Sequence, residues 1–166
     1  VAAHTIGQRV DMFLLMPLMG IGMAAGVMAG QNLGARRPER AVKSGWYAVF
    51  IAQAFMVLWT VLLFTMAEWV VRLFNSEPAL VEMGANFLRI AAVGYLFISF
   101  PMVFQNCIAG AGDTVPPMVL SLVGMWVLQI PLIYFLSQIP SLGVYGVRWG
   151  IVIANFVGMG FFLIYF

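Results

Sequence analysis

The sequence predicts an all-α integral membrane protein that crosses the bilayer five times. Hydrophobic residues make up 63% of the chain and charged residues only 8%, whereas roughly a quarter of the residues in a soluble domain are charged. Five stretches contain no charged residue, and each reaches the roughly 18 to 20 residues that a helix needs to cross the hydrocarbon core. These stretches are residues 12–35, 44–67, 90–112, 114–147 and 149–166. Because each is continuously apolar rather than alternating, it indicates a helix and not a barrel strand.

The first predicted span covers residues 1–33, which are compatible with one helix throughout. At about 1.5 Å per residue this helix would be roughly 50 Å long and would extend beyond the bilayer. Pro17 lies inside it and predicts a kink, because proline removes a backbone hydrogen bond. Arg9 and Asp11 fall near the outer boundary, where we interpret them as an interfacial pair; a position in a translocation cavity is the alternative.

A stripe of glycines lies in the second half of this span. Gly22, Gly26, Gly30 and Gly34 recur every four residues, so they project from nearly one face of the helix. Helices in lipid associate through close backbone contact at small residues. We therefore expect the stripe to pack against a neighbouring helix, with Gly34 capping the helix end.

A short basic connection follows the glycine stripe. Arg36, Arg37, Arg40 and Lys43 stand there against a single acid, Glu39. Cytoplasmic connections of membrane proteins are enriched in lysine and arginine. The sequence therefore places this connection in the cytoplasm, and the later connections alternate between the two sides.

Four more spans follow the basic connection. The charge-free run 114–147 is interpreted as one span and a loop, since two spans and a turn would need about 40 residues. Residues 137–148 then lie on the outer side and overlap the start of the last span, so Arg148 is counted among the outer charges. The predicted spans are residues 44–67, 77–110, 117–136 and 144–166.

Five amide side chains inside the spans are candidates for a substrate cavity. An amide in hydrocarbon must find a hydrogen-bonding partner, so each should face another helix or a wet cavity. Hydrogen bonding between helices is one interpretation and contact with a substrate is the other. The candidates are Gln53, Gln105, Asn106, Gln129 and Asn155. Gln105, Asn106 and Gln129 stand near Pro101 and Pro131, where we expect irregular helix geometry.

The chain has no recognisable pattern of a catalytic or metal site. His4 is its one histidine, and the patterns HExxH, GxSxG and GxxxxGK do not occur. We therefore predict that the protein is not an enzyme and uses no cofactor or metal. The formal net charge is +2, but most basic residues flank the spans, so they indicate membrane topology rather than binding of nucleic acid.

Four sequence blocks resemble the multidrug and toxic compound extrusion (MATE) family of transporters. They occur in the order and spacing of the family and extend over essentially the whole chain. The blocks are MPLMGIGMAAGVMAGQNLGARRPERA at 16–41, LRIAAVGYLF at 88–97, AGAGDTVPPM at 109–118 and IPSLGVYGVRWGI at 139–151. The run WVLQIPLIYFL at 126–136 resembles the second lobe of the family.

This resemblance implies a transporter with two pseudo-symmetric lobes of six helices each. Residues 1–166 would supply five helices of the C-terminal lobe, from the eighth to the twelfth, and would be incomplete at both ends. The N-terminal lobe would be missing from this chain. The resemblance also implies a cytoplasmic connection at residues 31–43, in agreement with the basic residues there.

The resemblance further implies secondary active efflux by alternating access. The exported compounds would be amphipathic and often cationic, in exchange for H⁺ or Na⁺, across the inner or plasma membrane of the cell. The partners would be membrane lipid and small organic substrates. Some members carry a carboxylate near the position of Ile98, but residues 90–112 contain no acid. We therefore expect the coupling-ion site outside this chain and interpret Asp113 as a capping and turn residue.

Three alternatives stay open at this point. A flippase for lipid-linked oligosaccharide or polysaccharide, from the same superfamily, would be favoured by a strongly basic cavity. An intramembrane enzyme would need a nucleophile and a base within reach of each other. A structural membrane subunit would have no cavity and would leave its buried amides paired with one another.

Overall fold

The protein folds into membrane-length helices. The computed structural model describes residues 2–73, 78–139 and 145–166. All regular structure in these residues is helical, and five helical rods are long and apolar enough to cross a membrane. The elements are α1 (Ala2–Gly34), α2 (Pro38–Arg72), α3 (Pro78–Gly110), α4 (Val115–Leu122), the π-helix η1 (Val123–Gln129), α5 (Ile130–Ser137) and α6 (Gly146–Tyr165). The predicted class, an all-α integral membrane protein, is therefore confirmed.

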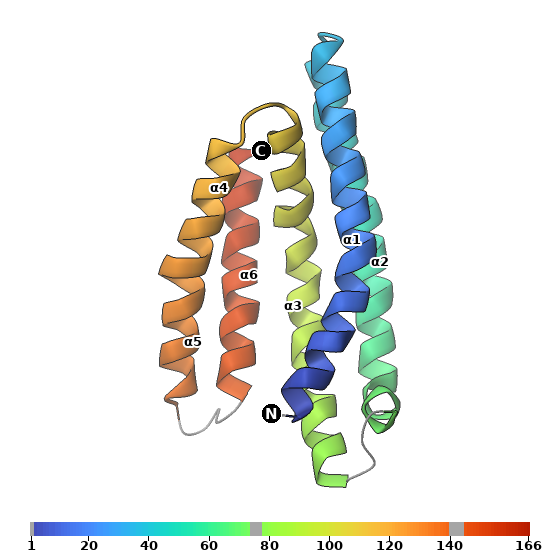
Figure 1. Cartoon of the computed structure of the whole chain (residues 1–166), viewed down its shortest axis with the longest axis vertical. Helices are drawn as coiled ribbons and strands as arrows, with labels where there is room; N and C mark the ends of the chain where they lie inside the picture. Colours follow the sequence, from blue (N-terminus) through green and yellow to red (C-terminus); the bar gives the residue numbers. More distant parts are fainter. Residues whose placement is uncertain (1, 74–77, 140–144) are drawn as a thin grey trace.

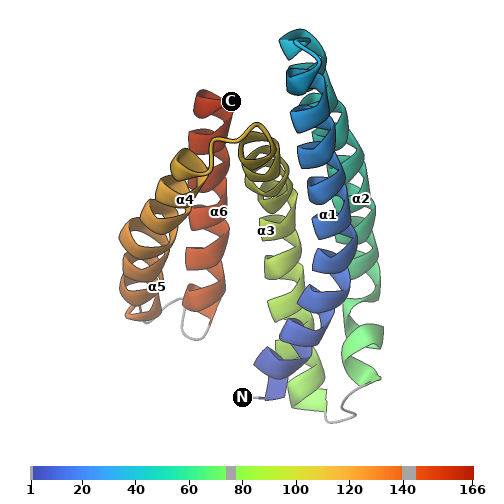
Figure 2. The same ribbon diagram turned by 45° about the horizontal axis from the view of Figure 1, so that its top comes forward.

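Helix α3 is the central element of the bundle. It packs against α1 and α2 on one side and against α6 on the other, and α5 packs on α6. Figures 1 and 2 show the two groups of helices on either side of α3. The turn after α1, the connection after α3 and the end of α6 lie at one end of the bundle (Figure 1). The basic turn after α1 and Asp113 therefore share one end, as antiparallel spans require.

Helix α2 is longer than the apolar stretch that predicted it, and residues 44–67 lie in its interior. Pro38 occupies the first turn, where its missing N–H needs no partner. Glu39 in the same turn interacts favourably with the positive end of the helix. Charged residues at both ends of α2 thus belong to the helix although they are outside the apolar stretch.

The fourth span contains a π-helix just before a proline. α4, η1 and α5 together form Val115–Ser137, a span of 23 residues, and η1 ends two residues before Pro131. Pro131 has no N–H to donate, and its ring excludes the carbonyl four residues earlier, so the preceding turns widen. The irregularity predicted at Pro131 is present. α3 continues as an α-helix through Pro101, and α1, which contains Pro17, bends in its N-terminal half (Figure 1).

Three glycines of α1 bring its backbone against α3. A Cβ atom placed on Gly26 would lie 2.6 Å from the carbonyl oxygen of Asn106, and one on Gly30 would lie 2.6 Å from that of Gly110. A Cβ on Gly22 would lie 2.9 Å from Nδ2 of Asn106. Carbon atoms do not approach oxygen or nitrogen this closely without displacement, so the observed separation of α1 and α3 depends on glycine.

The end of α1 is capped by an arginine in the left-handed conformation. Arg36 has a φ of 58°, its N–H donates to the oxygen of Leu33 at 2.9 Å, and the N–H of Arg37 donates to that of Asn32 at 2.9 Å. These are the two hydrogen bonds of a Schellman motif. Two expectations for Gly34 are corrected. The capping residue comes two positions later, after the last helical residue, and no described atom of a neighbouring helix lies within 4 Å of a Cβ placed on Gly34, so this glycine does not pack as the other three do.

Apolar side chains lie both inside and outside the bundle. Leu14, Met56 and Phe104 are fully buried between α1, α2 and α3. On the outer surface, Phe13 is 73% exposed and Tyr47 is 67% exposed. Soluble proteins rarely expose large apolar surfaces, so the outer face is suited to lipid. The chain is a multi-pass membrane protein.

Candidate functional site

A buried charged cluster joins three helices. Asp11 comes from α1, Tyr95 from α3 and Arg148 from α6. The hydroxyl of Tyr95 donates a hydrogen bond to Oδ1 of Asp11, and Nη1 of Arg148 lies 3.8 Å from Oδ2 of the same carboxylate. The Arg148 side chain is only 7% exposed and that of Asp11 27%. These three residues are here called the Asp11 cluster.

The position of Arg148 corrects the sequence interpretation. The sequence interpretation counted Arg148 among the charges of the outer connection, although the last predicted span, residues 144–166, already includes it. α6 begins at Gly146, so Arg148 lies in its first turn. The turn directs the side chain into the bundle, where its guanidinium carbon lies 5.6 Å from the centre of the Phe87 ring. This is a cation–π distance. In the described part of the chain, Nε and Nη2 of Arg148 are buried without a hydrogen-bond partner.

A small cavity lies beside the cluster. Its volume is about 150 Å³, and its lining includes Asp11, Tyr95, Arg148 and Asn155. Gly94 forms part of the wall, and a Cβ there would lie 3.2 Å from Cγ2 of Val152 on α6. The lack of a side chain at Gly94 thus allows α3 and α6 to enclose the cavity.

The other predicted amides lie away from this cavity. Gln53 on α2 accepts a hydrogen bond of 2.6 Å from the hydroxyl of Ser99 on α3. Asn106 donates to the backbone oxygen of Met102 in its own helix, at 2.7 Å. Gln105 is exposed on α3, and Gln129 is half-buried in η1. Of the five candidates, the structure places Asn155 alone at the Asp11 cluster.

Two members of the cluster were not recognised as candidates in the sequence. Tyr95 lies within an uncharged apolar run, where nothing distinguishes it from other interior aromatic residues. Arg148 lies at the outer end of the last predicted span, where a charged side chain can face water, so its burial beside Asp11 was not visible in the sequence. The one available signal was the pair of opposite charges, Asp11 and Arg148, near the outer ends of two predicted spans.

The charges of the cluster compensate each other. Both carboxylate oxygens of Asp11 have a partner, one in Tyr95 and one in Arg148. Removing either charge would leave the other uncompensated inside the bundle, which is strongly unfavourable. An additional cation at Asp11 would have to compete with the guanidinium. The cluster is therefore suited to holding α1, α3 and α6 together.

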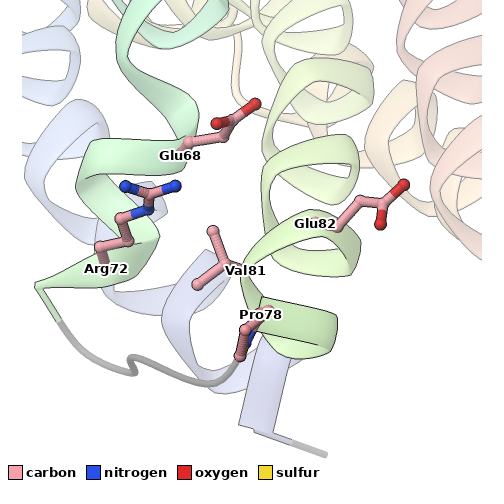
Figure 3. A pocket seen from close by; sticks show the side chains of 5 residues that line it. All are labelled: Glu68, Arg72, Pro78, Val81 and Glu82. Atoms are coloured by element: carbon pink, nitrogen blue, oxygen red, sulfur yellow. The ribbon is translucent and has the colours of Figure 1, made fainter.

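A second hollow lies on the surface between α2 and α3, with a volume of about 560 Å³. Figure 3 shows its lining side chains, with the carboxylates of Glu68 and Glu82 at separate places on the two helices. Glu68 instead forms an exposed ion pair with Arg89 at 3.3 Å. Among the residues that the structure describes, no three potential metal ligands come together. The geometry offers neither an enclosed nor a convergent site there.

Comparison with known proteins identifies the family. The model of the MatE family matches residues 1–135. The chain belongs to the MatE family. A curated MatE-like relative from Thermotoga maritima, named probable multidrug resistance protein NorM, is 25% identical over 154 residues. The match covers 91% of this chain and 32% of the relative, so the chain spans about a third of the length of that protein.

Solved structures of MATE transporters share the fold. One, described as the inward-facing conformation of a multidrug resistance MATE family transporter, matches with a TM-score of 0.90 at 24% identity and covers 98% of this chain and 38% of that one. Another, described as the outward-facing conformation, matches with a TM-score of 0.92 at 24% identity and covers 99% and 37%. The MatE chain described here thus has the fold of part of a transporter.

Proposed function

We propose that this MatE chain forms most of the C-terminal lobe of a secondary active efflux antiporter. The transporter would export amphipathic, often cationic organic compounds in exchange for H⁺ or Na⁺ by alternating access. Membership of the MatE family and the multidrug resistance name of the Thermotoga relative support this proposal. The partner of this lobe would be an opposing lobe of the same protein.

The proposal rests mainly on one observation: the chain has the fold of transporters whose structures were solved in two opposite access states. Nearly the whole chain has the fold seen in the inward-facing and in the outward-facing transporter. A segment whose fold is the same in both states can move as one body. This is the behaviour that rocking of one lobe against another requires.

Internal contacts support the same interpretation. The Asp11 cluster ties α1 to α6 across α3. Gln53 and Ser99 join α2 to α3, and the glycines of α1 place its backbone directly on α3. Helices α1 and α2 are thus each held to α3 by a specific contact, while the apolar outer face of the bundle can move within the lipid.

We infer the orientation of the chain in the membrane from the basic turn after α1. We infer the location of the coupling-ion site from the partners of the Asp11 carboxylate. Arg36, Arg37, Arg40 and Lys43 favour a cytoplasmic turn between α1 and α2. Because both oxygens of Asp11 already have partners, we keep the coupling-ion site in the opposing lobe. The drive per coupled charge would be about 2.3 kcal/mol for each 100 mV of membrane potential.

The geometry of the cavity beside the Asp11 cluster gives little support to the three alternative functions. A flippase for anionic lipid-linked sugars would be favoured by a strongly basic cavity, but Arg148, the cation in the described lining of the cavity, is compensated by Asp11. An intramembrane enzyme would need a nucleophile beside a base, and the described cavity offers an ion pair with a tyrosine. A purely structural subunit would not need a cavity beside a buried charge.

An efflux assay tests the proposal. The complete protein that contains this segment is expressed in a drug-sensitive host, and the retention of ethidium is followed by fluorescence. We expect ethidium to leave the cells while the ion gradients are intact and to be retained once both the H⁺ and Na⁺ gradients are collapsed. Efflux that persists without either gradient would contradict ion coupling, and no efflux at all would contradict the proposed activity.

The same assay on this chain alone is the matched control. Residues 1–166 lack the opposing wall of the proposed cavity, so we expect no efflux above that of cells without the protein. Gradient-dependent efflux by the chain alone would show that an opposing lobe is unnecessary.

A further inference from the structure

A groove between α1 and α2 runs down from the basic end of the bundle. Its volume is about 580 Å³. At its mouth the lining includes Arg40 and Lys43, and deeper in the bundle it includes Ile21, Ala24 and Ala48. Small residues on the facing helices leave this space open. The groove is thus charged at one end and apolar along its length.

The dimensions of the groove correspond to one leaflet of a bilayer. From Lys43 to Ile51 the apolar wall on α2 descends about 12 Å, and from Asn32 to Ile21 the wall on α1 descends about 16 Å, at about 1.5 Å per residue. Half of the hydrocarbon core is about 15 Å thick. An acyl chain lying in the groove would therefore reach roughly the bilayer midplane.

The polar groups at the mouth favour an anion over a neutral headgroup. The amide of Asn32 already donates to the oxygen of Met28 at 2.8 Å, and the hydroxyl of Ser44 donates to that of Ala41 at 2.7 Å. Across the described residues, neither Arg40 nor Lys43 forms an ion pair. The charged donors at the mouth are therefore Arg40 and Lys43.

The charges around the mouth of the groove also favour an anionic headgroup. Arg40 and Lys43 lie near the N-terminal end of α2, which carries a partial positive charge, and Arg36 and Arg37 are close by in the chain. A single acid, Glu39, stands among them. A phosphate at the mouth would relieve the mutual repulsion of these charges, whereas a cationic drug would increase it.

We propose that this groove binds an anionic phospholipid, with the phosphate between Arg40 and Lys43 and one acyl chain against Ala24 and Ala48. Basic pockets between membrane helices are suited to acidic headgroups. Tyr47, which also lines the groove and is 67% exposed, lies at the level of the headgroups. Assignment to the inner leaflet rests on the proposed orientation, but selectivity for the headgroup does not.

Lipid retention by the complete protein tests this proposal. Delipidated protein is titrated with phosphatidylglycerol or with phosphatidylcholine of the same acyl chains, and bound lipid is counted by native mass spectrometry. We expect phosphatidylglycerol to bind at least about tenfold more tightly, since each basic residue near an anionic headgroup favours binding. Equal binding of the two lipids would overturn the proposal.

Two pairs of variants locate the site. Arg40→Gln with Lys43→Gln should remove most of the preference, whereas Arg36→Gln with Arg37→Gln, which removes the same charge outside the groove, should leave most of it. Ala48→Trp should block the apolar part, whereas Ala54→Trp, at an exposed position of α2 outside the lining, should not. Equal effects within either pair would show a diffuse surface effect and would overturn the proposal.

Competition distinguishes the lipid from other occupants. Tetraphenylphosphonium, a cationic amphiphile, should not displace phosphatidylglycerol; displacement would make the groove a substrate path instead. Cross-linking between the two lobes of the complete protein should be equally efficient in Ala48→Trp and in Ala54→Trp. A loss of cross-linking in Ala48→Trp alone would make the groove a contact between the lobes. Ethidium efflux is measured separately, so failure of the transport proposal leaves the lipid result intact.

Discussion

At the scale of single residues, the Asp11 cluster illustrates how a charge can be kept inside a membrane protein. Arg148 is nearly fully buried, and its charge is compensated by Asp11 at 3.8 Å and by the face of Phe87. Tyr95 occupies the remaining oxygen of Asp11. Each member therefore provides the charge or hydrogen-bonding partner of another. The stability lost on substitution depends on whether a buried charge is left without its partner.

A double-mutant cycle measures this dependence. Asp11→Asn should destabilise the complete protein by about 3–5 kcal/mol, because the buried charge of Arg148 loses its partner. Adding Arg148→Met should restore much of the loss, because no charge then remains. Unfolding of the purified protein in detergent gives the free energies.

An exposed ion pair provides the control for this cycle. Glu68 and Arg89 are 53% and 35% exposed, so Glu68→Gln should cost no more than about 1 kcal/mol. If Asp11→Asn costs as little as Glu68→Gln, the Asp11 cluster does not hold the bundle. A double variant as unstable as the sum of its single variants would also contradict the account.

Two residues with positive φ give opposite predictions at helix ends. Arg36 has a φ of 58° and Gly112, after α3, has a φ of 94°. The left-handed conformation costs a residue with a side chain about 1–2 kcal/mol. Arg36→Gly should therefore stabilise the protein by about 1 kcal/mol, and Gly112→Ala should destabilise it by a similar amount. Shifts of the same sign in thermal unfolding would show that these conformations do not control stability.

At the scale of whole elements, the packing of α1 on α3 depends on glycines at particular turns. Gly26 and Gly30 lie against backbone oxygens of α3, whereas no described atom lies within 4 Å of a Cβ on Gly20 in the same helix. The regular spacing of glycines in the sequence predicted a packing face. It could not predict which turns are in contact, because that depends on the tilt of α3.

Alanine substitutions separate contact from helix propensity. Gly26→Ala should cost about 1–3 kcal/mol, because the new methyl group displaces the backbone of α3. Gly20→Ala should be stabilising by about 0.5–1 kcal/mol, because alanine is the better helix former. The yield of folded complete protein and its unfolding temperature check both. A stabilising Gly26→Ala would mean that α1 and α3 are farther apart than the structure has them.

At the scale of the whole molecule, the membrane explains why the fold was predictable. Lipid demands long, continuous apolar helices, so the uncharged stretches indicated all five spans, and the proline at position 131 indicated the irregular helix geometry before it. The interior was harder to predict. Arg148 was counted with the outer charges, because its inward direction follows from the facing Asp11, which the sequence alone does not place beside it. Such partners come from three separate helices, and no local pattern brings them together.

The distance between two points within the lobe tests whether the lobe moves as one body between the two access states. Spin labels replace Tyr47 on α2 and Phe135 on α5, which are 67% and 65% exposed, and a third label is placed on the opposing lobe. Electron–electron resonance then compares the complete protein in inward-facing and outward-facing conditions. We expect the distance between positions 47 and 135 to stay constant while the distance from position 47 to the opposing lobe changes. A change within the lobe, or no change between the lobes, would contradict the account.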